Sequence, residues 1–191
     1  MSDTQWPTFQ VFHQAKEGQA HQNAGSVHAP DSEMALLIAR DVFVRRPGCT
    51  SLWVVAADHI FSKTAQELVD GSWLEEETGT SSKEGVEPGT QPEPYYVFGK
   101  LQHTGTHTYL GTIEARTPAQ ALRQALNTWT DQPHLVWWVF PARLVTQSAP
   151  DDTESMFEPV LDKRFRDQAE YHTVSLMRDI KQSTTHEEAP Q

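Results

Sequence analysis

The amino-acid sequence repeats itself at an offset of 86 residues, and this duplication constrains the fold more than any other feature of the chain. Identical residues recur in one register: Val11/Val97, Phe12/Phe98, His21/His107, Gly25/Gly111, Ala29/Ala115, Ala35/Ala121, Leu36/Leu122, Ala39/Ala125 and Pro47/Pro133. One deletion after Pro133 then brings Trp53 and Val54 onto Trp138 and Val139. This agreement, interrupted once in a predicted loop, indicates two copies of one folding unit.

Each copy has the pattern strand, strand, helix, strand. Aromatic and β-branched residues predict the first strand, and a polar loop leads to the second. The last strand is apolar on both faces, which is typical of a covered central strand. Strands are expected at 8–13, 24–28 and 52–57 in the first copy, and at 95–100, 109–115 and 135–140 in the second.

The helix of each copy carries apolar residues three and four positions apart, which predicts one buried face. These residues are Ala35, Ile38, Ala39, Val42 and Phe43, and in the second copy Ala121, Leu122, Ala125, Leu126 and Trp129. Asp31 and Thr117 are the expected N-caps. Since a single ββαβ unit of about 55 residues has little core, we expect an α+β fold in which two tandem units pack as a pseudo-dimer.

The net charge of −11 is concentrated in residues 62–93, which hold eight acidic and two basic residues. From Gly71 onward this stretch is rich in Gly, Ser, Thr, Pro and Glu, and it lacks the apolar surface that offsets ordering entropy. The expected organisation is a first unit over 1–61, a flexible acidic linker over 62–93 with a short helical start at 64–69, a second unit over 94–148, a tail over 149–182 and a disordered end over 183–191.

Composition excludes several classes of protein. A single cysteine excludes an internal disulfide, a Cys-ligated zinc site and an iron–sulfur cluster. No apolar run approaches the ~20 residues of a membrane helix, and the polar N-terminal residues lack a signal-peptide core. A cytoplasmic protein is therefore expected. The acidic excess argues against nucleic acid as the main partner, because phosphate binding depends on Lys and Arg.

Nine histidines require a test for metal binding. Neither predicted helix contains the Glu-x-x-His pattern of a carboxylate-bridged di-iron site. His103 and His107 lie in a predicted loop, and a strand separates the directions of His21 and His28. Glycine-rich nucleotide loops are missing, and Cys49 has no assignable partner histidine. The residues alone favour a binding or assembly module, with a metal site or a catalytic thiol as the less favoured alternatives.

Most of the six tryptophans fall in predicted strands or helices, where we expect them in the core. Trp137 and Trp138 should point to opposite faces of their strand, so that one of them fills the contact between the units or a partner groove. Trp6 and Trp73 lie outside the predicted elements and are better candidates for a partner surface. Arg45-Arg46 either compensates the helix dipole or forms a docking patch for an acidic partner.

A longer pattern runs through residues 6–60. It comprises Trp6-Pro7-Thr8-Phe9-Gln10-Val11-Phe12, His21, Gly25-Ser26-Val27-His28-Ala29, Asp31, Met34-Ala35-Leu36, Ala39-Arg40-Asp41, Arg45-Arg46 and Ser51-Leu52-Trp53-Val54-Val55. A second stretch comprises Phe157-Glu158-Pro159, Lys163, Phe165-Arg166 and Tyr171 through Val174. The first pattern resembles the PaaB family (phenylacetic acid degradation), which supplies the B component of ring-1,2-phenylacetyl-CoA epoxidase, and the second is similar to the closing tail of that family.

The resemblance implies a non-catalytic accessory subunit without a cofactor. Family members pair as dimers and bridge a di-iron catalytic subunit and a related bundle subunit, while a reductase supplies electrons from NADPH. The second unit departs from the pattern, since Glu114 replaces the counterpart of His28, and Thr130 and Asp131 occupy or adjoin the positions of the Arg pair. We therefore expect a fused duplicate with one specialised face, and further homo-oligomerisation stays open.

The function expected from the sequence is a structural or bridging subunit of a phenylacetyl-CoA epoxidase-type oxygenase, with the di-iron and bundle subunits as partners. No cofactor, metal or catalytic residue is expected in the chain itself. The alternative is a stand-alone α+β module that binds a small molecule, such as an acyl-CoA, between its units. The candidate partner interface consists of Trp6, His21, His28, Arg45, Arg46, Trp73 and Trp137.

Overall fold

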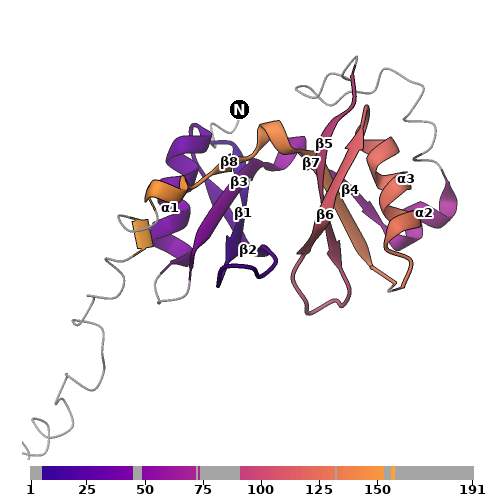
Figure 1. Ribbon diagram of the computed structural model, residues 1–191, viewed down its shortest axis with the longest axis horizontal. Helices are drawn as coiled ribbons and strands as arrows, with labels where there is room; N and C mark the ends of the chain where they lie inside the picture. The colour runs from indigo at the N-terminus through magenta and orange to yellow at the C-terminus, as the bar shows by residue number, and fades with distance from the viewer. Residues whose placement is uncertain are drawn as a thin grey trace, which may run out of the picture.

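A computed structural model describes residues 6–44, 49–71, 73, 91–131, 133–152 and 156–157 (Figure 1). The first unit consists of β1 (Thr8–Gln14), β2 (Gln22–His28), α1 (Ser32–Phe43) and β3 (Ser51–Ala56), followed by η1 (Ala57–His59), β4 (Phe61–Thr64) and α2 (Ala65–Asp70). The second unit consists of β5 (Glu93–Lys100), β6 (Thr108–Ala115), α3 (Pro118–Thr128) and β7 (Val136–Pro141), followed by η3 (Ala142–Leu144), β8 (Thr146–Gln147) and η4 (Pro150–Asp152). The strand–strand–helix–strand order thus occurs in both halves of the chain.

Local details recur at the offset of the sequence repeat. The Asp31 side chain accepts a hydrogen bond from the Met34 amide at the start of α1, and Thr117 accepts one from the Gln120 amide at the start of α3. Both N-caps are therefore confirmed. The hairpin of β1 and β2 shifts register after Val11, and the hairpin of β5 and β6 shifts register after the counterpart, Val97. The duplication predicted from the sequence is present in the backbone geometry as well.

A glycine in each second strand admits an aromatic ring from the end of the helix above it. A Cβ at Gly25 would lie 3.0 Å from the Phe43 ring, and one at Gly111 would lie 2.8 Å from the Trp129 ring. Gly25 also has a φ of 136°, a conformation that residues with a side chain rarely adopt. The ring and the glycine together set how closely each helix approaches its sheet.

The described strands form one eight-stranded sheet in the order β4-β7-β5-β6-β2-β1-β3-β8, with antiparallel neighbours throughout. The two units meet where β2 pairs with β6 through Gln22 and Thr108. The Asn23 amide donates to the His107 carbonyl oxygen and the Tyr109 amide donates to the His21 carbonyl oxygen, both at 2.8 Å. Gln22 and Thr108 occupy the same position of the repeat, so the junction joins equivalent parts of the two units.

The chain after each unit crosses to the other unit. Strand β4 follows the first unit but pairs with β7, from Phe61 opposite Val139 to Thr64 opposite Val136. Strand β8 follows the second unit but pairs with β3. The crossing strands were not expected from the sequence, because residues 62–64 of β4 lie in the stretch 62–93 assigned to the linker and β8 lies in the range assigned to the second unit. The short helix expected at 64–69 is confirmed as α2, with Thr64 in a capping box with Glu67.

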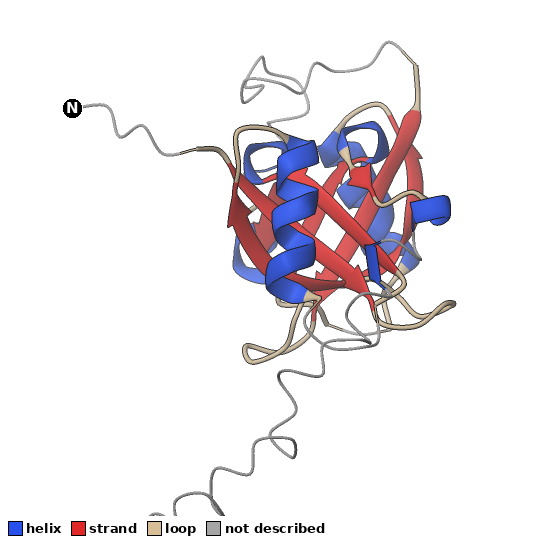
Figure 2. Cartoon of the chain, turned by 90° about the vertical axis from the view of Figure 1, so that its left-hand side faces the viewer, coloured by secondary structure: helices blue, strands red, loops and turns tan. Residues whose placement is uncertain are grey.

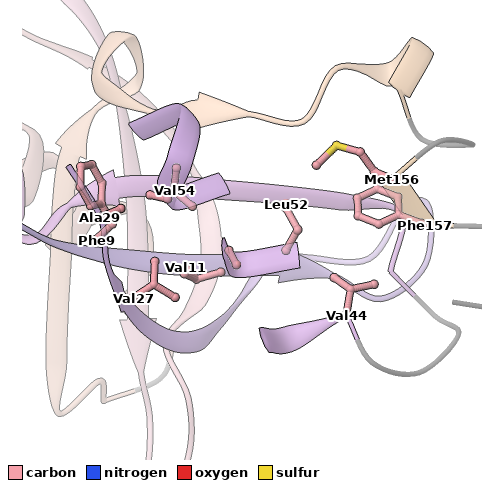
Figure 3. Packing of buried hydrophobic residues seen from close by; sticks show 11 residues of the cluster. Phe9, Val11, Val27, Ala29, Val44, Leu52, Val54, Met156 and Phe157 are labelled. Carbon is pink, nitrogen blue, oxygen red and sulfur yellow. The ribbon is translucent and has the colours of Figure 1, made fainter. Parts of the chain in front are cut away.

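Among the described residues, three hydrophobic clusters hold the fold together. One lies between α1 and its strands and includes Met156 and Phe157 from the end of the described chain (Figure 3). A second lies between α3 and its strands and includes Trp73. The third contains residues of both units, led by Phe12 and Phe98. The helices thus stand on the outside of the two units, and the helix-free faces of the sheet pack against each other (Figures 1 and 2).

Most of the predicted helix faces are found as expected, with one exception. Ala35 and Ala39 in α1 and Ala121, Leu122 and Ala125 in α3 are buried. Val42 was expected on the buried face but is 42% exposed, in the last turn of the helix. In the parts of the chain that the structure describes, no helix combines the length and apolar character needed to cross a membrane.

Candidate partner interface and the contact between the units

The contact between the units contains the same histidine–tryptophan pair twice. The His21 ring stacks on Trp53 with centroids 3.7 Å apart and an interplanar angle of 20°. The His107 ring stacks on Trp138 with centroids 3.5 Å apart and an angle of 13°. The two histidines are identical at matching positions of the repeat, and so are the two tryptophans. The sequence therefore already carried a signal for this pair.

Aromatic rings fill the space between these two stacks. The rings of Phe12, Phe98 and Phe140 lie within 5.6 Å of one another, and all three side chains are fully buried. Tyr96 and Tyr109 close the cluster from the second unit, with ring centroids 5.6 Å apart. The arrangement supports a packed contact between units, and it leaves the described centre of the contact occupied by protein side chains.

The two stacks differ in one hydrogen bond. His21 Nε2 lies 3.1 Å from the Ser51 hydroxyl. The counterpart of Ser51 is Val136, and His107 Nε2 is a buried atom without a hydrogen-bond partner among the described residues. Burial lowers the pKa of both imidazoles to about 4, with smaller contributions from His13 at His21 and Lys100 at His107. Both rings are therefore neutral at neutral pH.

Two of the candidate partner residues lie in the core instead. Trp73 is 5% exposed and packs in the cluster beneath α3, where its indole N–H donates to the Leu68 carbonyl oxygen at 3.3 Å. Trp137 is also buried in that cluster, and its counterpart Leu52 is buried in the corresponding cluster beneath α1. The expectation that Trp73 and Trp137 face a partner is therefore wrong. Trp138, which points to the other face of β7, is the one of the two that lies at the contact between units, as its counterpart Trp53 does.

His21 is likewise buried within the chain, at the stack with Trp53. Trp6 and His28 remain on the surface, and Trp6 is 58% exposed. His28 Nδ1 lies 3.1 Å from the Trp6 carbonyl oxygen, which holds the two residues side by side at the start of β1. Arg45 and Arg46 lie outside the described residues.

The described residues support neither of the two enzymatic alternatives, a metal site and a catalytic thiol. In the ranges that the structure covers, no three His, Cys, Asp or Glu side chains are grouped so that they could hold a metal ion. Cys49 is partly buried, and burial raises the pKa of its thiol to about 11. A thiol with that pKa is protonated at neutral pH and is a poor nucleophile.

Comparison with known proteins agrees with the repeat. The family model for phenylacetic acid degradation B (PaaB) matches the chain twice, over residues 5–81 and 92–178. The chain belongs to the PaaB family. A similar protein is the B subunit of 1,2-phenylacetyl-CoA epoxidase from Escherichia coli (strain K12), which is 43% identical over 67 residues, covering 35% of this chain and 70% of that protein. No solved structure matches the chain.

The first PaaB match extends past the strand–helix core of the first unit. The first match extends to residue 81 and so includes β4, α2 and Trp73, all of which contact the second unit. A PaaB unit in this chain therefore comprises the strand–helix core and the crossing segment that follows it.

Proposed function

We propose that this chain is a non-catalytic, bridging subunit of a phenylacetyl-CoA epoxidase-type oxygenase complex in phenylacetate degradation, with the cytoplasm as its compartment. The observation that carries the proposal is the repeated PaaB match together with a relative named as the B subunit of such an epoxidase. In this proposal the di-iron catalytic subunit and its related bundle subunit are the partners, and the chain itself supplies no catalytic group.

We further propose that the two units form a pseudo-dimer that stands in for two copies of a single-unit PaaB protein. The β2–β6 junction supports this, since counterparts Gln22 and Thr108 pair with each other. The exchange of β4 and β8 between the units supports it as well. The alternative, a small-molecule module with its ligand between the units, is less favoured because buried rings of Phe12, Phe98 and Phe140 occupy that contact.

The test is co-expression of the full chain with the di-iron and bundle subunits of its own oxygenase, followed by native mass spectrometry and an epoxidation assay. We expect a stable complex that contains this chain, and loss of epoxidation when the chain is omitted. Full activity and unchanged assembly without the chain would contradict the bridging role. A shift in melting temperature of the isolated chain with phenylacetyl-CoA would instead favour the small-molecule alternative.

A charge-reversal variant tests the remaining candidate surface. We expect Arg45→Glu with Arg46→Glu to weaken assembly if the pair docks an acidic partner, and Trp6→Ala to weaken it if the exposed indole is part of the same surface. Thr130→Glu places a carboxylate at the matching end of α3 and serves as the control. Equal assembly of all these variants would remove Trp6 and the Arg pair from the interface.

A further inference from the structure

Helix α1 carries a second row of apolar residues beside its buried alanines. Met34, Leu37 and Val42 are 44%, 46% and 42% exposed, and the half-buried Ile38 lies among them with part of its side chain against the cluster beneath the helix. Met34, Ile38 and Val42 follow at intervals of four residues and Leu37 lies three residues after Met34, so they form one stripe along the helix, which we call the outer α1 stripe. Asp41 interrupts the stripe, and its carboxylate pairs with Arg40 at 2.9 Å.

The matching stripe on α3 is polar. The counterparts of Met34, Leu37, Ile38, Asp41 and Val42 are Gln120, Arg123, Gln124, Asn127 and Thr128. The two helices have the same fold environment and the same buried row of alanines. The fold therefore does not require apolar residues at these positions, and the difference between the helices points to something that covers α1 and does not cover α3.

The segments that follow the two crossing arms differ in the same way. Residues 74–90 follow the buried Trp73 beside α3; their only large apolar residues are Leu74 and Val86, and they carry five Glu and one Lys. Residues 158–178 follow Phe157; they carry four acidic residues and four Lys or Arg. The large apolar residues of this second segment are Val160, Leu161, Phe165, Tyr171, Val174, Leu176 and Met177.

The described chain ends near the C-terminal end of α1. Phe157 packs in the cluster beneath α1, at the same end of that cluster as Leu52 and Val44, the C-cap of the helix (Figure 3). The 12 residues of α1 span about 18 Å, at 1.5 Å per residue. An extended chain covers that distance in roughly six residues, so residues 158–178 have ample length. The second PaaB match extends to residue 178, which makes this segment part of the family unit.

We propose that residues 158–178 pack against the outer α1 stripe and cover Met34, Leu37, Ile38 and Val42. The apolar side chains of the segment cover the exposed part of the stripe and remove it from water. The free energy of this burial holds the segment in place. The polar α3 stripe needs no such cover, in agreement with the hydrophilic residues 74–90 that follow the other arm. The inference concerns the chain on its own and does not depend on the proposed role in the oxygenase.

Disulfide trapping in the full chain tests the proposal. In a Cys49→Ser background, which removes the single native cysteine, Leu37→Cys is combined in turn with Leu161→Cys, Phe165→Cys or Val174→Cys. We expect at least one pair to form an intrachain disulfide under mild oxidation. Arg123→Cys with the same three partners is the matched control and should form none. Disulfides with both helices alike, with neither helix, or between two chains would overturn the proposal.

Oxidation of Met34 gives a second measurement on the chain with its native stripe. With dilute peroxide, we expect Met34 sulfoxide to form about fivefold more slowly in the native chain than in a Leu161→Ser, Phe165→Ser variant, since a docked segment must open before reagent enters. Equal rates would overturn the proposal. Protection of Met34 that appears only when the oxygenase subunits are added would also overturn it, because a partner and not the segment would then cover the stripe.

Discussion

Acidification should weaken the contact between the units through its two buried histidines. His21 and His107 each stack on a tryptophan, and burial lowers both of their pKa values from 6.5 to about 4. The perturbation is a shift from pH 7.5 to pH 5. At pH 7.5 both imidazoles are neutral in the folded and the unfolded chain, so they contribute no pH dependence there.

At pH 5 the unfolded chain binds a proton at each imidazole, whereas the folded chain leaves both largely neutral. The unfolded state then binds more protons, so stability falls as the pH drops from about 6.5 to about 4. At 1.36 kcal/mol per pH unit, the loss at pH 5 is about 2 kcal/mol for each histidine and about 4 kcal/mol together. Below the folded pKa both states are protonated and the loss levels off.

The assay is urea unfolding at several pH values between 7.5 and 4, followed by tryptophan fluorescence. The reference variant is His21→Phe with His107→Phe, which keeps an aromatic ring on each tryptophan and removes both titrating groups. Carboxylates and the other histidines titrate in both proteins, so the difference between the two stability curves isolates the buried pair. Parallel curves over this range would refute the assignment of the pH dependence to these stacks.

Three further outcomes are expected in denaturant unfolding at pH 7.5. Ser51→Ala should destabilise the chain by about 1–3 kcal/mol by removing the partner of His21 Nε2, whereas Val136→Thr should stabilise it by about 1 kcal/mol by offering His107 a hydroxyl at constant volume; changes of the same sign would contradict this. Trp73→Ala should cost about 3–5 kcal/mol because the indole is buried, and Trp6→Ala at most about 0.5 kcal/mol because its indole is exposed; similar losses would place them in similar environments. Gly25→Ala should destabilise by more than about 1 kcal/mol, from both the close Phe43 ring and the positive φ, and unchanged stability would show that the ring moves freely.

The repeat and the local patterns predicted much of the fold, because those signals are carried by residues near one another in the sequence. Asp31 and Thr117 cap the helices as expected, and the alternation of β7 separates Trp137 from Trp138. Alternation alone does not tell which face of a strand meets its own helix. The choice between the two tryptophans therefore depends on how the units pack, and Trp137, the one predicted to face a partner, lies in the core.

The crossing arms escaped prediction for a related reason. Strand β4 has four residues and β8 has two, and each is stabilised by a strand of the other unit rather than by its own neighbours. Trp73 stands in an acidic, glycine-rich stretch whose composition is typical of a linker, and its burial depends on a cluster formed mainly by the second unit. Burial of this kind leaves no periodic signal in the surrounding sequence.

The exchange of arms also has a consequence for the order in which the chain acquires its structure. The Leu52 amide donates to the Ser148 hydroxyl across 96 residues of sequence, and Phe157 completes the cluster beneath α1. The N-terminal half therefore leaves the ribosome before the residues that finish its own core have been synthesised. Contacts of such long sequence separation slow folding, because their loop entropy must be overcome before they contribute. The finished protein should consequently form late and as a whole, rather than one half at a time.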